Sequence, residues 1–371
     1  MRRREFLKAA GALAALGAAN GCGATLRRTA VVDPVRRFDR VRVSADRVIR
    51  TVVGLRPFRR SGFVVRAEKL DAHTLIHNYG HGGGGMTLSW GTAHLATELA
   101  LATGQTRAAV LGCGGVGLAT ARLLQRRGFA VTIYAKDLPP NTTSNIAGAQ
   151  WAPAETYDAE SQSDAFRDQF VRAAHLSHRE FQNLAGDYYG VRWIENYVVS
   201  GRPFQRPQGA AQNIQDLYPD ARDLGRGDHP FDGAYVRRFV TMLIEPPVYL
   251  NAMLRDFELA GGTVVVRAFD DLRAVAALAE PVVMNCTGLG AKALVGDEEL
   301  MPIKGQLTIL LPQPEVDYIT LQDDLYMFPR RDGILLGGTH ERDNWTLEPN
   351  AEAARHVLDG HARFFRAMRS R

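Results

Sequence analysis

The chain has 371 residues, of which 46% are hydrophobic and 23% are charged. This globular composition, long enough for two domains, excludes a disordered chain, a collagen-like repeat and a disulfide scaffold. The three cysteines lie in no zinc-ligand spacing, so we expect no metal site. The net charge of +5 includes no basic cluster interleaved with aromatic residues, which argues against nucleic-acid binding.

The first residues have the pattern of an export signal. Arg2-Arg3-Arg4 precede an apolar run, Ala9–Ala19, that is too short to span a bilayer as a permanent helix. Paired arginines before such a run predict a twin-arginine signal over residues 1–23, and hence an exported, periplasmic or otherwise extracytoplasmic protein. Two alternatives stay open: a frayed basic terminus, and a lipoprotein with its lipid anchor at Cys22, although Ala19 stands where such sites usually have leucine.

A run of four glycines, Gly82–Gly85, comes next along the chain. Consecutive glycines carry a high cost in backbone entropy, so we expect them where the backbone must touch a flat ligand. Met86 and Thr87 then begin a predicted helix that runs to about residue 103, with its positive end near the ligand's ring edge. A flexible linker is the alternative, which the neighbouring Tyr79 and Trp90 disfavour.

The strongest motif is a strand, glycine turn, helix and strand over residues 108–134. This order is typical of a mononucleotide-binding unit, and the flanking elements make the GxGxxG pattern specific. Gly112 allows the tight turn, Gly114 lets the backbone approach a pyrophosphate, and Gly117 lets the helix pack closely on the strand. After the second strand, Lys136 stands where an acidic residue is usual in an NAD site, and Asp137 follows one residue late.

The remaining elements indicate two kinds of sheet. Helical patterns at 249–260 and 272–278 alternate with strands at 263–266 and 281–285, which predicts a parallel sheet. In contrast, a helical seam over 166–184 is followed by strand patterns around residues 197–199, 303–311 and 334–336. These patterns predict a second, largely antiparallel domain that covers the first.

Several stretches together resemble the D-amino-acid oxidase family, which includes the D-aspartate oxidases. The matching stretches are Gly54-Leu55-Arg56-Pro57, His77–Thr87, Gly112–Gly117, Thr142–Gly148, Asn285–Gly288, Gly305-Gln306, and Tyr326 through Gly338. The resemblance implies an α/β fold, with a Rossmann-like FAD-binding domain on a parallel sheet and a second α+β substrate domain on a mainly antiparallel sheet. The predicted segments are 50–158 and 246–297 for the FAD-binding domain, and 159–245 and 298–371, with strand 38–49, for the substrate domain.

The order of these stretches differs from that of the family. There the dinucleotide fingerprint opens the chain, whereas here Arg56 and Gly82 precede Gly112. The sequence therefore resembles a circular permutation, with the old termini joined through Gly104–Arg107 and new ends opened between Arg371 and about Phe38. Because permutation requires termini that are neighbours on the surface, we expect the C-terminal helix, 351–367, near the start of a strand at 41–50.

The implied cofactor is FAD, bound noncovalently between the pyrophosphate turn and the glycine run. Lys136 departs from the family pattern at the ribose. The predicted FAD-binding residues are Gly82, Gly83, Met86, Thr87, Gly112, Gly114, Gly115, Val116, Gly117, Asp137, Thr142, Thr143, Ser144, Gly148 and Ala149.

By the same resemblance, Arg56 binds the substrate carboxylate and Tyr326 is its phenol partner, whereas a surface arginine and a core tyrosine are the structural alternatives. The implied reaction is oxidative deamination of a D-amino acid, by hydride transfer from its Cα to flavin N5. Dioxygen then reoxidises the flavin to give hydrogen peroxide, and the imino acid hydrolyses to a 2-oxo acid and ammonia. Two other functions stay open: a non-oxidase flavin-binding or electron-transfer relative, and a nicotinamide-dependent dehydrogenase, which Lys136 disfavours.

Three departures from the family concern the substrate. Gln322 replaces a second tyrosine and Gly84 replaces an aromatic residue, and both changes are expected to widen the pocket. His340 stands where aspartate oxidases place an arginine, which argues against a dedicated acidic-substrate site. Surface positions are expected for the nearby arginines, Arg330, Arg331 and Arg342, and binding of an acidic substrate by one of them is the alternative.

Overall fold

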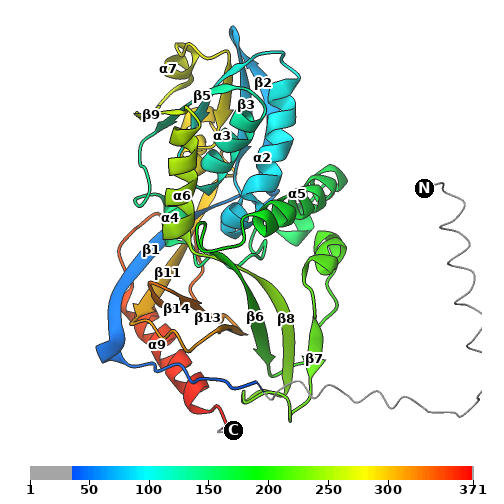
Figure 1. The fold of residues 1–371 in the computed structure, drawn as a ribbon, viewed down its shortest axis with the longest axis vertical. Coiled ribbons are helices and arrows are strands. Elements are labelled where there is room, and N and C mark those ends of the chain that lie inside the picture. Colours follow the sequence, from blue (N-terminus) through cyan, green and yellow to red (C-terminus); the bar gives the residue numbers. More distant parts are fainter. Residues whose placement is uncertain (1–35, 370–371) are drawn as a thin grey trace, which may run out of the picture. The chain divides into compact units, whose positions relative to one another are not determined.

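A computed structural model describes residues 36–369 of the chain, which form two β-sheets flanked by helices (Figure 1). The predicted signal over residues 1–23 and the predicted lipid-anchor residue Cys22 lie outside the described residues. Within the described part, no helix combines the length and the apolar character needed to cross a bilayer.

The first sheet has six strands in the order β2-β3-β10-β4-β5-β9. Strands β3, β10, β4, β5 and β9 are parallel, and β2 pairs antiparallel with β3 at the edge. The bounds are β2 (Val64–Leu70), β3 (His73–Tyr79), β4 (Arg107–Leu111), β5 (Ala130–Ala135), β9 (Thr263–Val266) and β10 (Val282–Asn285). The predicted parallel sheet is therefore present, in a mixed sheet with one antiparallel edge strand.

Helices cover both faces of this sheet because its strands are apolar on both sides. On β4, Ala108 and Val110 join the large core beneath four helices, whereas Ala109 and Leu111 join the core beneath two short ones. This alternation follows the two-residue period of a strand. The four helices are α2 (Gly85–Leu101), α3 (Gly115–Arg126), α5 (Asp164–Asn183) and α6 (Pro246–Leu259), and the short ones are α7 (Leu272–Ala276) and α8 (Ala291–Val295).

The second sheet has the order β1-β11-β14-β13-β12-β6-β8-β7, with β15 paired to β11. Its pairings are antiparallel except between β12 and β6. The bounds are β1 (Val48–Phe58), β6 (Val191–Ser200), β7 (Arg222–Leu224), β8 (Tyr235–Ile244), β11 (Met301–Leu310), β12 (Tyr318–Gln322), β13 (Leu325–Arg330), β14 (Gly333–Gly337) and β15 (Glu341–Arg342). Helix α9 (Ala351–Arg366) packs beside β11, β13 and β14 through an apolar face that includes Val357, Phe364 and Phe365 (Figure 1).

Two predicted segments lie elsewhere than expected. No strand forms over residues 38–47; β1 instead begins at Val48 and pairs with β11 along its length, so residues 50–58 belong to the antiparallel sheet rather than to the FAD-binding domain. Helix α5, predicted in the substrate domain, packs on α2 beside the parallel sheet. Gly91 permits this contact, because a Cβ there would lie 1.8 Å from the Ala173 carbonyl oxygen.

The two ends of the described fold are neighbours. The Arg40 side chain donates a hydrogen bond to the Met368 carbonyl oxygen at 2.5 Å, and the Tyr318 hydroxyl donates one to the Asp39 carbonyl oxygen at 2.7 Å. Val41 shares a core with Phe365 and Met368. The C-terminal helix therefore lies near residue 41, as expected, although the strand expected to start there begins only at Val48.

Candidate active site

A cavity of about 1030 Å³ lies where the ends of the parallel strands face the second sheet. Its wall includes the starts of α2 and α3 and parts of β1, β11 and β13. All the predicted site residues line it, namely Arg56, Tyr326, Gly82, Gly83, Met86, Thr87, Gly112, Gly114, Gly115, Val116, Gly117, Asp137, Thr142, Thr143, Ser144, Gly148 and Ala149. The volume lies at the upper end of the range typical of small-molecule and cofactor sites.

The glycine turn after β4 requires the absence of side chains. Gly112 has φ +112°, and a Cβ there would lie 2.5 Å from the Cys286 carbonyl oxygen. A Cβ on Gly117 would lie 2.1 Å from the Gly112 carbonyl oxygen. The turn and the close packing of α3 therefore both depend on glycine, as the fingerprint predicts.

The first turn of α3 opens directly onto the cavity. Its N-cap, Gly114, offers no side-chain hydrogen bond to the helix, and the Ser144 hydroxyl accepts one from the Gly115 N–H at 2.9 Å. Backbone N–H groups and the helix dipole together make such a helix start favourable for an anion. The start of α3 therefore has, at the predicted place, the backbone arrangement that favours a phosphate group.

The upstream glycine run forms the adjoining wall and also has a packing function. Cβ atoms on Gly82 and Gly83 would lie 2.0 Å from the Glu155 and 2.7 Å from the Ala154 carbonyl oxygen, respectively. Met86, in the first turn of α2, packs on Gly115, because a Cβ on that glycine would lie 2.6 Å from the Met86 Sδ. The positive ends of α2 and α3 therefore meet at one cavity.

The far end of the cavity lies where β5 and β9 end side by side. Lys136 and Asp137 follow β5 and line the cavity, so both charges are available there. The residues after β9 line it too: the Arg267 guanidinium lies over the Phe269 ring, 4.6 Å from its centroid. Sequence reasoning missed this second group; the signal was present, because adjacent parallel strands end at the same sheet edge.

At the opposite end, two strands that are distant in sequence bring Arg56 and Tyr326 together. The Arg56 Nη2 lies 3.4 Å from the Tyr326 hydroxyl, a long hydrogen bond, and its Nη1 lies 3.5 Å from the Thr339 carbonyl oxygen. The Tyr326 ring stacks on Phe328 with centroids 5.0 Å apart. Burial raises the pKa of the Tyr326 phenol, and the Arg56 charge opposes that rise only in part, so the phenol stays protonated at neutral pH.

Two glycines make room for this pair. A Cβ on Gly305 would lie 2.7 Å from both terminal nitrogens of Arg56, and one on Gly337 would lie 2.1 Å from the Tyr326 ring. Gly337 is the cross-strand partner of Tyr326, so the ring lies over bare backbone. The motifs that contain these glycines belong to the predicted resemblance, but their function as space for the two side chains appears only in the structure.

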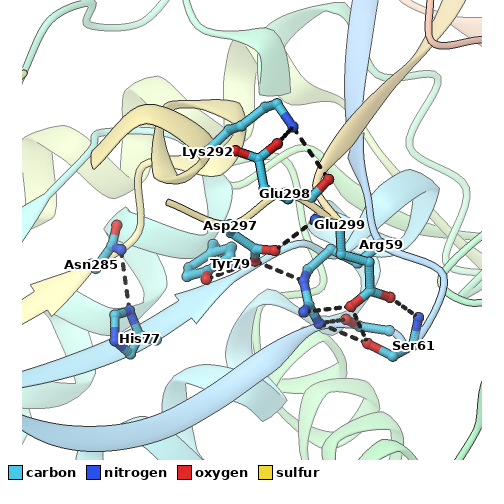
Figure 2. A network of polar contacts seen from close by, with 10 residues as sticks. Arg59, Ser61, His77, Tyr79, Asn285, Lys292, Asp297, Glu298 and Glu299 are labelled. Atoms are coloured by element: carbon cyan, nitrogen blue, oxygen red, sulfur yellow. Dashed lines mark hydrogen bonds and ion pairs between the residues drawn. The ribbon is translucent and has the colours of Figure 1, made fainter. Parts of the chain in front are cut away.

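A polar network fixes the end of the strand that carries Arg56. Figure 2 shows Arg59 between two carboxylates, with 2.8 Å from its Nε to Asp297 and 2.6 Å from its Nη2 to Glu299. The Tyr79 hydroxyl, at the end of β3, donates to the same Asp297 at 2.8 Å. Since Arg59 follows Arg56 by three residues, this network ties the end of β1, close to Arg56, to the end of β3 in the parallel sheet.

Glu155 and His340 line the cavity beside Arg56, and only His340 was considered from the sequence. The Arg56 Nε lies 3.6 Å from the Glu155 Oε2, while the His340 Nδ1 pairs with the Glu155 Oε1. Partial burial raises the pKa of the Glu155 carboxyl, but the His340 hydrogen bond and the Arg56 and Arg342 charges outweigh it, so the net shift is downward. Glu155 also has φ +50°, which is rare for a residue other than glycine.

The other predicted departures do not reach the cavity. Gln322 ends β12 in a hairpin and Gly84 packs against Thr156, and neither belongs to the cavity wall, so these two positions place no side chain in the cavity. The three nearby arginines are held by carboxylates away from the lining: Arg330 by Asp332, Arg331 by Asp187 and Arg342 by Asp158. Arg330 is buried rather than on the surface, because it also donates to the Ala147 carbonyl oxygen at 3.0 Å.

No group of three or more metal-binding side chains occurs within residues 36–369. The cavity instead fits a long dinucleotide. Its middle is a glycine cradle in which a Cβ on Gly114 or Gly115 would meet Ser144 or Met86. An adenosine would lie at the end with the charged groups that follow β5 and β9. A flavin ring would lie at the other end, beside the start of α2.

Comparisons with known proteins agree with this geometry. The family model described as FAD dependent oxidoreductase matches residues 23–99 and 107–371. The D-amino-acid oxidase of Rubrobacter xylanophilus is 31% identical over 266 residues, covering 68% of this chain and 75% of the relative. The human D-aspartate oxidase is 30% identical over 263 residues, covering 68% and 74%.

Solved structures show the same fold at lower identity. The glycine oxidase of Geobacillus kaustophilus superposes with a TM-score of 0.53 at 17% identity, covering 70% of this chain and 78% of that chain. The iminodiacetate oxidase of Chelativorans gives a TM-score of 0.50 at 16% identity, covering 70% and 79%. With its glycine cradle and its family match over most of its length, the chain belongs to the FAD-dependent oxidoreductase family of the D-amino-acid oxidases, and its cofactor is FAD.

Proposed function

We propose that the protein is a D-amino-acid oxidase, which converts a D-amino acid, dioxygen and water into a 2-oxo acid, ammonia and hydrogen peroxide. The observation that carries this proposal is the Arg56–Tyr326 pair, which lies on the cavity wall that also holds the starts of α2 and α3. The resemblance to D-amino-acid oxidases and to a D-aspartate oxidase at about 30% identity supports the same substrate class.

The chain's own residues bind and orient the substrate. The planar Arg56 guanidinium takes a carboxylate through two parallel hydrogen bonds, a geometry that lysine does not reproduce. The Tyr326 phenol, protonated at neutral pH, donates to the same carboxylate from β13. With the carboxylate fixed, the wall of the cavity determines which hydrogen on Cα faces the start of α2, and this selects one enantiomer.

When bound, FAD supplies the two-electron acceptor and its reoxidation by dioxygen. Gly112, Gly114 and Gly115 would hold its pyrophosphate against the start of α3, and Met86 and Thr87 would lie at its ring. The apolar side chains around the cavity, such as Phe328 and Leu307, exclude water from the reacting carbon. No acid or base is required from the protein for transfer of the Cα hydrogen itself.

The test is product analysis under air. Purified protein loaded with FAD should release hydrogen peroxide, ammonia and a 2-oxo acid in equal amounts from D-amino acids, and none of them from the L enantiomers. Bound flavin without peroxide release from any D-amino acid would contradict the proposal and favour a non-oxidase flavoprotein.

We infer that the chain is a circular permutation of the family order. The family model matches in two stretches separated at residues 100–106, which comprise the last two residues of α2 and the turn before β4. The contact between Arg40 and Met368 supports the inference, since the opened ends must be neighbours. A chain that starts at residue 105 and joins Met368 to Phe38 through a short linker should fold and bind FAD as the natural chain does. Two controls each carry one of the two changes: the linker between Met368 and Phe38, or the break before residue 105. If both controls are soluble and the rearranged chain is not, the permutation is contradicted.

We also infer export by the twin-arginine route, with cleavage or lipid anchoring near Cys22. The pattern of Arg2-Arg3-Arg4 before an apolar run supports it. Replacement of these three arginines by lysine should retain the protein in the cytoplasm of a bacterial host that otherwise exports it. Unchanged export of the lysine variant would contradict this route.

A further inference from the structure

Glu155 places a negative charge where a carboxylic substrate must bind. Its Oε2 lies 3.6 Å from the Arg56 Nε, whereas the Tyr326 hydroxyl lies 3.4 Å from the Arg56 Nη2. The two contacts use different nitrogens of one guanidinium, so a carboxylate held between Arg56 and Tyr326 leaves the Glu155 contact in place. Glu155 is therefore a fixed neighbour of bound substrate rather than a competitor that must leave.

The position of Glu155 is determined by its surroundings. The Gly83 N–H donates to the Glu155 carbonyl oxygen at 3.1 Å, and the Gly82 backbone leaves room for that carbonyl. Its φ of +50° is unfavourable for a side chain with a Cβ, and such a conformation persists only where neighbouring contacts impose it. His340 holds the other carboxylate oxygen from the loop after β14.

The charges at this end match a zwitterion. An amino acid carries its ammonium group on the carbon next to its carboxylate, so it presents one negative and one positive charge to Arg56 and Glu155. A second carboxylate on the side chain would meet the Glu155 charge in a partly desolvated cavity, where like charges repel strongly. Arg330, Arg331 and Arg342 lie outside the lining and each pairs with a carboxylate of its own, so none of them presents a guanidinium to that second carboxylate.

We propose that Glu155, held by His340, is the residue that determines charge specificity: it favours amino acids with a single carboxylate and disfavours dicarboxylic ones. This inference rests on the proposed function for its substrate class. It also separates the chain from the specificity stated in the name of the human relative, a D-aspartate oxidase.

The first test measures binding without turnover. Butanoate and succinate have four carbons and differ by one carboxylate, and neither has an amine to oxidise. Calorimetric titration of the FAD-loaded full chain should show tighter binding of butanoate. In Glu155→Gln, the succinate-to-butanoate affinity ratio should rise about tenfold. Glu155→Gly removes the same charge, and glycine adopts a positive φ without strain. This variant should give the same rise even if the glutamine variant folds poorly.

The matched control is Glu98→Gln, which removes one charge from the exposed ion pair between Glu98 on α2 and Arg172 on α5. Its affinity ratio should equal that of the natural protein. An unchanged ratio in both Glu155 variants, or an equal rise in the Glu98 variant, would overturn the inference.

The second test compares D-2-aminobutanoate with D-aspartate, which differ in the same way. The kcat/KM ratio should move toward D-aspartate by about tenfold in Glu155→Gln. Oxidation of D-2-aminobutanoate with no change in either ratio would overturn the specificity inference and leave the proposed function standing. A change in the binding ratio without oxidation of any D-amino acid would reject the proposed function and leave the charge discrimination standing.

Discussion

The cofactor end and the substrate end of the cavity are built in different ways. At the cofactor end, short contiguous motifs such as Gly112–Gly117 and Gly82–Thr87 form the wall, and backbone atoms face the ligand space. At the substrate end, Arg56, Tyr326, Glu155 and His340 come from four separate stretches and act through side chains. Short motifs in the sequence therefore determine the backbone wall of the cofactor end. The arrangement of side chains at the substrate end depends instead on how β1, β11, β13 and β14 pair.

The largest effect is expected from Gly117→Ala at the cofactor end. Its Cβ would lie 2.1 Å from the Gly112 carbonyl oxygen, so the glycine turn or the start of α3 must shift. Affinity for FAD should fall by about 100-fold or more, because the helix start no longer faces the pyrophosphate. The dissociation constant of FAD measures this. Gly201→Ala, where a Cβ has open space, should bind FAD normally; equal retention of FAD by both variants would refute the backbone cradle.

Arg56→Lys should have the converse effect at the substrate end. It should retain FAD but lose about 100-fold in kcat/KM, because lysine keeps the charge and loses the two-point geometry. Arg50→Lys on the same strand changes an exposed ion pair with Asp332 and should behave like the natural protein. Similar losses in both variants would place the effect in the strand rather than in the carboxylate contact.

The glycines that make room for the pair should give a smaller effect. Gly305→Ala would displace the Arg56 guanidinium and Gly337→Ala the Tyr326 ring, each at a distance far below van der Waals contact. We expect kcat/KM to fall about tenfold in each, with FAD affinity unchanged, since the cofactor end is not touched. Loss of FAD in either variant would show that the two ends are not independent.

The smallest effect concerns acid stability of the cofactor end. Burial lowers the pKa of His81 to about 3, below its value in an unfolded chain, so the unfolded state binds the proton more readily. The stabilisation from neutral His81 is therefore intact above about pH 6.5 and is lost as the pH falls below that value. The free energy of unfolding should decrease by about 1 kcal/mol between pH 7 and 5.5. His81→Asn should flatten this part of the unfolding profile, whereas substitution of the exposed His356 should not. Burial also lowers the pKa of His361, to about 4, so part of the slope should remain in the His81 variant; a slope as steep as that of the natural protein would show that His81 does not contribute.

The same contrast explains how far the sequence was informative. The mixed fold, the parallel sheet, the strand bounds at Thr263–Val266 and the fingerprint turn follow from local periodicity and glycine spacing. The pairing of β1 with β11 rather than with the cofactor-binding part depends on tertiary register, which no local pattern encodes. Gln322 and Gly84 aligned with pocket residues of the family, yet the hairpin at β12 and the packing on Thr156 take both away from the cavity.

Glu155 shows the limit most clearly. It follows Trp151-Ala152-Pro153-Ala154 in a stretch with no helix or strand, and nothing in that stretch predicts a functional carboxylate. Its position arises from a positive φ, from the backbone of Gly82 and Gly83, and from His340 far along the chain. Such a site becomes visible only when the contacts are known.

The central claim is that the cofactor end and the substrate end of the cavity act together on one amino acid. Anaerobic single-turnover mixing tests this claim most directly. FAD-loaded natural protein and Arg56→Ala are mixed separately with D- and L-amino acids while the flavin absorbance is followed. We expect rapid bleaching of the natural protein by D substrates only, and full flavin content with much slower bleaching in Arg56→Ala. A natural protein whose bound flavin stays oxidised with every D-amino acid, or an Arg56→Ala variant that bleaches as fast as the natural protein, would contradict a cavity that presents an amino acid to the flavin through Arg56.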